Sequence, residues 1–446
     1  MIIGIDASRA NKPNKTGTEW YSWHLIEELK KIAVLPPFAK EPALSDNRTG
    51  RAGDGGVVLP PFSKGRAGEG LDQFLLYTND RLIGDLAKCP ENFAEKVLTW
   101  PPKYLWTQIR LWWELLVSPP DVLFVPAHTI PLLPISRKVK VAATVHDVGF
   151  KRFPELYKPI QVWYHDLTMR RIKSRADFII TISEFSKREM MELYGVKENQ
   201  IKVVYLGYDD QTYNEAAAGK AEAIRNKYNL TSPYLLYVGR LEKKKNIGNI
   251  VAAFALAKEQ LDEPPLTLPT GRQAPPFVKG EDQAILPPFA KGRAGEGLKL
   301  VLAGAGGHQF EEIKKIIADL KLEQEIILPG YVAQDDLPGL IAGAEIFMFP
   351  TLYEGFGLPI LEAMACGTPV IASDMLPHTE VGGEAGVYAD PHSPQSLSDA
   401  IIKILSDAEL KQLLKEKGLL RAKEFSWRQT AEGVYEIIKN YGNQDN

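Results

Sequence analysis

The segment FPTLYEGFGLPILEAMACGTPVIAS, from Phe349 to Ser373, reads as a strand, a loop and a helix in direct succession. The apolar run ends near Pro350, and Pro359 suits the first turn of the helix that follows. Glycines between them let a ligand approach the backbone, and the free N–H groups at a helix start favour an anion. The loop can therefore hold a diphosphate, with Glu354 and Glu362 on either side to accept hydrogen bonds from hydroxyl groups. Spacing alone is equally consistent with an ordinary strand–turn–helix that carries two solvated glutamates.

Strand-like and helical stretches alternate along the rest of the chain. One set of strand-like runs includes MIIGIDAS at the N-terminus and VAATVHD from Val141, and a second set includes YLLYVGR from Tyr234. Such alternation is the signature of parallel sheets with crossover helices. Two sets predict an α/β protein with two doubly wound, Rossmann-like domains that face each other across a cleft. The expected ligand site is this cleft, at the carboxyl ends of the strands.

The predicted domain boundaries follow from the two sets of strands. Residues 1–207 form the predicted N-terminal domain, and residues 208–424 form the predicted C-terminal domain. Residues 425–446 have the pattern of a helix.

Two Pro- and Gly-rich stretches interrupt these domains and repeat one another. LPPFSKGRAGEGL begins at Leu59, and LPPFAKGRAGEGL begins at Leu286. Both have neither helical nor strand periodicity, and both follow a helical pattern and precede a strand-like run. We expect two inserted surface loops, at about 36–70 and about 264–297, because long surface loops cost little entropy. A Pro-rich recruitment motif is the alternative interpretation.

The composition excludes several classes of protein. The 446 residues are 45% apolar and 24% charged, which is normal for a soluble globular protein. A net charge of -3 gives no support to nucleic-acid binding, which needs a basic patch. The two cysteines are far apart and form neither a metal pattern nor a disulfide framework, so a reducing compartment is the simplest interpretation. No apolar run is long enough for a signal peptide or a transmembrane helix, and we expect a cytoplasmic protein.

The spacing of the two glutamates supports a family resemblance. A glutamate, seven residues and a second glutamate, with GFG after the first, is similar to the signature of the retaining family-4 glycosyltransferases of GT-B fold. The similarity covers nearly the whole chain outside the two inserts. It implies that Glu354 contacts the donor sugar as a catalytic residue, that Glu362 contacts the ribose, and that residues 425–446 pack back on the N-terminal domain. The resemblance also implies that the sugar and phosphates meet the backbone amides of Gly355, Phe356, Gly357 and Leu358.

The segment YVGRLEKKKNIGNI, from Tyr237 to Ile250, offers positive charge to the same donor. Arg240 has a planar fork that matches phosphate, and Lys245 is a compact point charge. The alternative interpretation is a basic loop that leads into a helix and has no role in ligand binding. The family pattern of G-R followed by K-N matches Arg240, Lys245 and Asn246, which implies that Arg240 and Lys245 bind the diphosphate.

The resemblance implies further site residues. His146 follows the strand-like run VAATV, and its H-D pair with a downstream F-P resembles the family segment near the reaction centre. A lone histidine is usually structural. The resemblance nevertheless implies that His146 is a catalytic residue and that Asp147 orients it. Many relatives carry a Gly-Gly pair before the first helix, whereas this chain has only Gly17 for the donor phosphates. In the segment PGYV, Tyr331 and Val332 would flank the base.

The family resemblance implies a hexosyltransferase reaction. It implies that the hydroxyl of a glycan or lipid-linked glycan attacks the anomeric carbon of a nucleotide-diphosphate sugar, with retention, in cell-surface polysaccharide or glycoconjugate assembly. Fixed positive groups and helix amides stabilise the leaving group, so we expect neither a metal nor a cofactor. The Trp-rich run from Trp100 is a core helix or an interfacial surface, which leaves peripheral contact with the inner face of the membrane open. The alternatives are a GT-B epimerase, a glycosyl phosphorylase and a non-catalytic sugar-nucleotide-binding protein.

Overall fold

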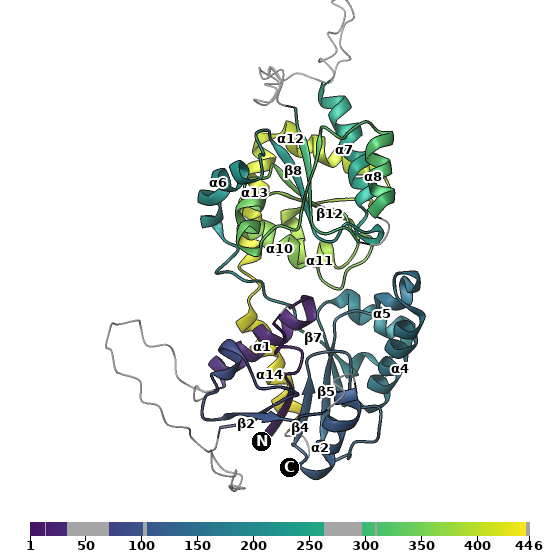
Figure 1. Cartoon of the computed structure of the whole chain (residues 1–446), viewed down its shortest axis with the longest axis vertical. Helices are drawn as coiled ribbons and strands as arrows, with labels where there is room; N and C mark the ends of the chain where they lie inside the picture. The colour runs from purple at the N-terminus through teal and green to yellow at the C-terminus, as the bar shows by residue number, and fades with distance from the viewer. Residues whose placement is uncertain (14, 34–70, 101–104, 263–296, 308–309, 443–446) are drawn as a thin grey trace, which may run out of the picture. The chain divides into compact units, whose positions relative to one another are not determined.

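The structure is a computed structural model that describes residues 1–13, 15–33, 71–100, 105–262, 297–307 and 310–442 (Figure 1). Both predicted inserts lie outside these residues, apart from Gly297. Their assignment as surface loops therefore stays a prediction.

The first sheet has seven strands in the order β3-β2-β1-β4-β5-β6-β7. Its strands are β1 (Ile2–Asp6), β2 (Gln73–Thr78), β3 (Phe93–Val97), β4 (Val122–Val125), β5 (Lys140–Val145), β6 (Phe178–Thr181) and β7 (Ile201–Val203). β1 pairs in parallel with both β2 and β4, so the order of the strands reverses at β1. This arrangement is that of a doubly wound fold, whose ligands bind where the order reverses.

The second sheet has six strands in the order β10-β9-β8-β11-β12-β13. Its strands are β8 (Tyr234–Val238), β9 (Lys299–Ala303), β10 (Ile326–Gly330), β11 (Ile346–Phe349), β12 (Val370–Ser373) and β13 (Gly386–Ala389). β8 pairs in parallel with β9 on one side and with β11 on the other. The strand order therefore reverses between β8 and β11, and the loops after these two strands leave the sheet side by side.

Helices cover the strands. The α-helices are α1 (Gly17–Ile32), α2 (Trp112–Val117), α3 (Gly149–Arg152), α4 (Pro159–Arg175), α5 (Glu184–Tyr194), α6 (Ala221–Lys227), α7 (Ile247–Asp262), α8 (Phe310–Asp319), α9 (Leu337–Ala342), α10 (Leu358–Ala365), α11 (His378–Gly382), α12 (Pro394–Ser406), α13 (Ala408–Ala422) and α14 (Trp427–Gly442). α7 and α8 lie on one side of the second sheet, and α6 and α13 lie on the other (Figure 1). The predicted α/β architecture with two Rossmann-like sheets is confirmed.

The sheets hold the core because both of their faces are covered. Every residue of β4, β11 and β12 is buried, as expected for parallel strands between two layers of helices. α1 contributes Tyr21, Leu25 and Leu29, whose spacing places them on one helix face. Within the residues that the structure describes, no helix is both long and apolar enough to cross a membrane.

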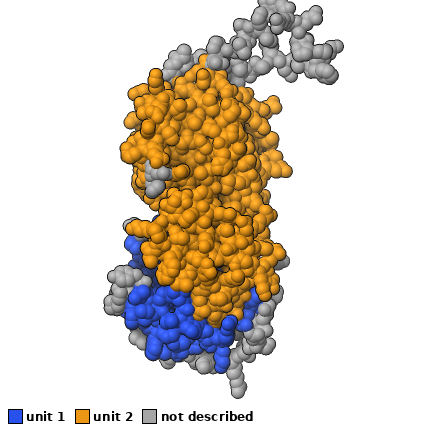
Figure 2. Space-filling view, turned by 90° about the vertical axis from the view of Figure 1, so that its right-hand side faces the viewer, with its two compact units in different colours: residues 1–143, 434–446 blue, residues 144–433 orange. Residues whose placement is uncertain are grey.

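The chain divides into two compact units, which we call unit 1 (residues 1–143 and 434–446) and unit 2 (residues 144–433) (Figure 2). α14 belongs partly to each. In unit 1 its Tyr435 Oη donates to Asp72 Oδ2 at 2.6 Å, and the Tyr435 ring lies 5.8 Å from that of Phe74 in β2. The end of the chain therefore packs on the first strands of unit 1. The predicted domain boundaries at 207 and 424 stay predictions.

Candidate active site

The loop between β11 and α10 is shaped by its glycines. A Cβ on Gly355 would lie 2.8 Å from the carbonyl oxygen of His146, so this position has no room for a side chain. Gly357 has a φ of 116°, a backbone conformation that L side chains rarely adopt, and it directly precedes α10. Crowding at Gly355 and backbone conformation at Gly357 therefore each require glycine, and the predicted approach of a ligand to this backbone stays a prediction.

The same loop presents backbone donors without protein acceptors. Gly355, Phe356 and Gly357 are buried, and Leu358 begins α10. Among the described residues, nothing accepts a hydrogen bond from the backbone N–H groups of Gly355, Phe356, Gly357 and Leu358. A buried donor left unsatisfied costs about 1–3 kcal/mol, and the start of a helix adds positive potential. This loop is therefore built to receive an anionic or hydroxyl-rich group.

Lys245 lies beside this loop and forms an ion pair with Glu354. Two hydrogen bonds connect the loops that carry them, one between backbone groups and one from a side chain to the backbone. The N–H of Leu352 donates to the carbonyl of Lys244 at 2.9 Å, and Asn246 Nδ2 donates to the carbonyl of Pro350 at 2.9 Å. Because β8 and β11 are neighbours, these contacts place the cation of one loop against the carboxylate of the other.

The ion pair keeps Glu354 ionised. Burial alone would raise the pKa of this carboxyl, but the charge and hydrogen bond of Lys245 outweigh burial and hold the pKa below its usual value. The two side chains are only 17% and 21% exposed, so the pair is screened less than a surface pair. Glu354 is thus a hydrogen-bond acceptor at neutral pH and is poorly suited to act as a general acid.

His146 and Asp147 follow β5 and lie against Gly355, His146 with its backbone carbonyl and Asp147 with its side chain. His146 is 8% exposed, and its carbonyl oxygen accepts from Ser186 Oγ at 2.8 Å. Burial raises the pKa of Asp147, although the Gly149 N–H donates to its Oδ1 at 2.8 Å. The structure therefore brings His146, Glu354, Lys245 and Gly355 together within unit 2.

Glu362 lies in the second turn of α10 and is half-buried. Burial, with a smaller contribution from the nearby charge of Asp209, raises the pKa of Glu362 to about 7. Near neutral pH this carboxyl therefore exchanges between a protonated and an ionised form, which changes its capacity to accept hydrogen bonds.

Replacing Glu362 with glutamine is expected to stabilise the protein at pH 8 but not at pH 4.5. The pKa of Glu362 is 4.5 in the unfolded state and about 7 in the folded state. Between these two values the unfolded state has lost the proton and the folded state still binds it, so wild-type stability falls as the pH rises from 4.5 to 7. The variant lacks this loss, and its advantage at pH 8 is on the order of 3 kcal/mol. Denaturant titration at both pH values measures it. Glu323→Gln, at an exposed glutamate, is the matched control, and an equal gain in both variants would contradict the account.

The other predicted residues lie in different surroundings. The Arg240 side chain is 71% exposed, with its Nε 4.0 Å from Glu242 Oε2. Val332 is buried after β10, whereas Tyr331 beside it is 78% exposed. The ring of Phe356 packs against the rings of Tyr205 and Phe425.

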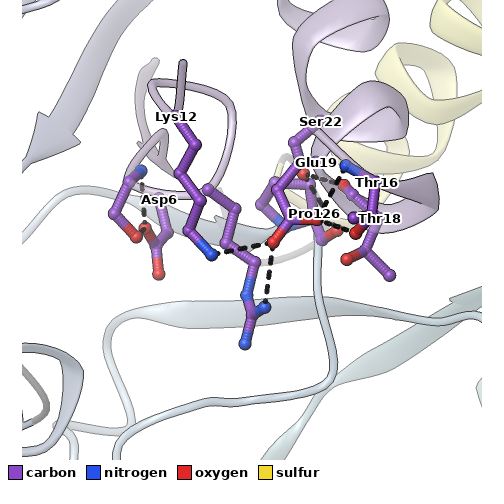
Figure 3. A network of polar contacts seen from close by, with 9 residues as sticks. Asp6, Lys12, Thr16, Thr18, Glu19, Ser22 and Pro126 are labelled. Atoms are coloured by element: carbon purple, nitrogen blue, oxygen red, sulfur yellow. Dashed lines mark hydrogen bonds and ion pairs between the residues drawn. The ribbon is translucent and has the colours of Figure 1, made fainter. Parts of the chain in front are cut away.

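Gly17 is the first residue of α1 and belongs to unit 1. A Cβ on it would contact nothing within 4 Å. Thr16 and Glu19 form a capping box at this helix start, and Lys12 Nζ lies 2.8 Å from Glu19 Oε1 (Figure 3). Burial opposes the ionisation of Glu19, but hydrogen bonds from Lys12 and Thr16 lower its pKa to about 2. The start of α1 thus has a carboxylate that already accepts from one of its backbone N–H groups.

The sequence interpretation missed a histidine next to the glycine loop. His378 is fully buried in α11, and its Nε2 lies 3.2 Å from Thr351 Oγ1. Burial lowers the pKa of His378 to about 4, so the ring is neutral. Its Cδ2 would lie 3.4 Å from a Cβ on Gly357, so it limits space under the loop. A lone histidine in the run LPHTE carries no local signal of this contact.

A metal centre finds no support in the described ranges, where no three His, Cys, Asp or Glu residues are grouped as ligands. The absence of a metal requirement remains a prediction.

Comparison with known proteins places this geometry in context. Residues 278–421 match the family described as Glycosyl transferases group 1, and residues 88–212 match Glycosyltransferase Family 4. The O-antigen chain mannosyltransferase B of Escherichia coli is 30% identical over 292 residues, which are 65% of this chain and 68% of that protein.

Two solved structures have the same fold. Sucrose-phosphate synthase from Thermosynechococcus elongatus has a TM-score of 0.64 at 18% identity, over 99% of this chain and 98% of its own. HepE from Anabaena, in complex with UDP and glucose, has a TM-score of 0.60 at 17% identity, over 98% of this chain and 99% of its own. At these identities the two structures support the fold alone.

Proposed function

Because this chain belongs to the family-4 glycosyltransferases and has the GT-B fold, we propose that it transfers a hexose from a nucleotide-diphosphate sugar to a hydroxyl group. The acceptor in this proposal is a glycan or lipid-linked glycan, and the anomeric configuration is retained. Retention rests on the family resemblance rather than on geometry.

One observation carries the proposal: the described residues provide no acceptor for the buried backbone N–H groups of Gly355, Phe356 and Gly357, and Lys245 pairs with the adjoining Glu354. A diphosphate satisfies both features, since its oxygens accept from the amides and its charge is balanced by the ammonium group. As the sugar leaves, negative charge grows on the diphosphate, and donors already in place stabilise it without rearrangement.

Glu354 takes the sugar side of the site in this proposal. Its lowered pKa keeps it a carboxylate, which accepts hydrogen bonds from sugar hydroxyls. The attacking acceptor oxygen must lose its proton. We do not assign this proton to Glu354, because the ion pair with Lys245 lowers the pKa of Glu354 and makes it a weaker base. A same-face substitution, in which the leaving diphosphate takes the proton, agrees with this assignment.

The likeness to an O-antigen mannosyltransferase favours a hexose donor and a role in cell-surface polysaccharide assembly. The structure of HepE with UDP and glucose favours a nucleotide sugar as the donor. We also propose peripheral contact with the inner face of the cell membrane. Exposed apolar side chains of α2 support this contact, since Trp113 is 54% and Val117 is 59% exposed.

A thermal-shift panel of nucleotide sugars tests the proposed function. One donor is expected to raise the melting temperature selectively, because ligand at 100 times its Kd stabilises the folded state by about 2.7 kcal/mol. Glu354→Gln is expected to lose the sugar-dependent part of the shift and to keep the shift caused by the matching nucleoside diphosphate. Product analysis with and without acceptor then separates transfer from epimerisation and phosphorolysis. No shift with any nucleotide sugar, together with no product, would overturn the proposal.

A further inference from the structure

Ser183 has two hydrogen-bonding partners at the start of α5. Its Oγ accepts from the N–H of Ser186 at 3.0 Å, which makes Ser183 the N-cap of the helix. The same Oγ donates to the carbonyl oxygen of Gly355 at 2.6 Å, although the two residues are 172 positions apart. Ser183 is fully buried, so no water competes for either bond.

The bond to Gly355 determines which way the next peptide group faces. The carbonyl of Gly355 and the N–H of Phe356 belong to one planar trans peptide, in which C=O and N–H point in opposite directions. A carbonyl held toward α5 therefore turns the Phe356 N–H away from α5. This N–H is one of the buried donors for which the described residues provide no acceptor.

The surrounding contacts leave the peptide little freedom. Ser186 Oγ lies 2.8 Å from the carbonyl oxygen of His146 and 3.3 Å from that of Gly355. The His146 carbonyl in turn occupies the space that a side chain on Gly355 would need. One turn of α5 thus holds both the strand end that carries His146 and the glycine loop.

Helix capping alone does not account for this arrangement. The caps of two other helices in unit 2, Ser393 and Asp407, accept from their own helices without donating to a distant loop. An aspartate is as good a cap as a serine, but a carboxylate cannot donate to a carbonyl. Position 183 requires a group that accepts and donates at once.

We propose that Ser183 is a positioning residue of the donor site, which aims the Phe356 N–H at the diphosphate by holding the Gly355 carbonyl. This role rests on the proposed function for its ligand, but the order of the loop itself does not depend on that function. Loss of the donated bond leaves the Gly355 carbonyl with only the longer contact from Ser186 Oγ at 3.3 Å, so the 355–356 peptide is held less firmly before the ligand arrives.

Three variants separate positioning from capping. Ser183→Gly keeps a favourable N-cap residue but removes the hydroxyl that donates to Gly355. Ser183→Thr keeps a hydroxyl, and the extended backbone at this position suits a β-branched residue. Ser393→Gly is the matched control, because it removes a hydroxyl that caps α12 and has no bond to Gly355. Hydrogen exchange of the peptide covering residues 351–358 and binding of UDP and GDP are measured for each.

Ser183→Gly is expected to speed exchange in residues 351–358 and to weaken binding of the nucleoside diphosphate, each by roughly tenfold, as expected for one lost hydrogen bond. Ser183→Thr should restore both readouts to near wild type, and Ser393→Gly should change neither. Unchanged exchange in Ser183→Gly, or equal losses in the Gly and Thr variants, would overturn the role of Ser183. Failure of the wild-type protein to bind either diphosphate would instead count against the proposed function, while exchange would still decide whether Ser183 holds the loop.

Discussion

Replacing Lys245 with methionine is expected to lower kcat/KM by roughly 100-fold or more, as removal of one fixed electrostatic group from a transition state typically does. Lys245 is the half-buried cation that contacts Glu354 beside the glycine loop. Methionine retains much of the side-chain volume but cannot balance the charge that grows on the leaving diphosphate. The variant also leaves Glu354 without its counter-ion, so the pKa of this carboxyl should rise. Steady-state transfer with the donor identified by thermal shift measures the effect.

Two control variants make this expectation specific. Lys243→Met removes a charge from the same turn, but Lys243 is exposed and makes no ion pair with a described residue. Its activity should stay within about twofold of wild type, as for most surface substitutions. The double variant Lys245→Met/Glu354→Gln removes the unbalanced charge, so its folding stability should recover while transfer stays low. An active Lys245→Met enzyme, or an equal loss in Lys243→Met, would contradict the assignment.

Replacing Gly355 with alanine is expected to have the second largest effect. The new Cβ would lie 2.8 Å from the His146 carbonyl oxygen and 3.2 Å from Asp147 Cβ, distances that force the loop or the end of β5 to move. Overpacking of this kind typically costs about 1–3 kcal/mol of stability. Displacement of the amides by even about 1 Å can lower activity roughly 100-fold. Melting temperature and nucleoside-diphosphate affinity should therefore both fall.

Gly219→Ala is the matched control for this substitution. A Cβ on Gly219 would contact nothing within 4 Å, so alanine is accommodated without movement. We expect wild-type affinity and a melting temperature equal to or above that of the wild-type protein. If Gly355→Ala behaves like Gly219→Ala, the crowding around Gly355 does not constrain the loop.

The parts of the site that local sequence encodes were predictable. Alternating strand and helix patterns placed Lys245 after β8 and Glu354 after β11, and a parallel sheet brings such loops to one edge. Gly357 before Pro359 marked the start of α10 for reasons of backbone conformation. These features depend on neighbours a few residues away, which a single sequence records.

The parts that depend on distant contacts were not predictable. Nothing near Ser183 indicates that its hydroxyl reaches Gly355, and nothing near His378 indicates that it lies under Gly357. The pairing of Lys245 with Glu354 likewise arises only when β8 and β11 are adjacent. Arg240 and Lys245 belong to the same sequence motif, and both are predicted to bind the diphosphate. The structure nevertheless leaves the Arg240 side chain largely exposed, which the motif does not indicate.

The two helix starts proposed for donor binding differ in how their backbone N–H groups are satisfied. α1 begins with a capping box in which Glu19 already accepts from the Thr16 N–H and pairs with Lys12. α10 begins after orphaned amides and has Lys245 nearby. Both helix starts have a carboxylate that is paired with a lysine, but Glu19 already accepts from a backbone N–H group at α1, whereas the described residues provide no acceptor for the amides before α10. This difference favours α10 as the main diphosphate site.

A crystal structure of the wild-type protein with the selected nucleoside diphosphate tests the central claim most directly. We predict that diphosphate oxygens lie about 3 Å from the backbone N–H groups of Phe356, Gly357 or Leu358 and from Lys245 Nζ, the usual distance for charge-assisted hydrogen bonds. The same structure should show Glu354 released from part of its contact with Lys245. A diphosphate bound elsewhere, with the amides at the start of α10 still lacking an acceptor, would contradict the account.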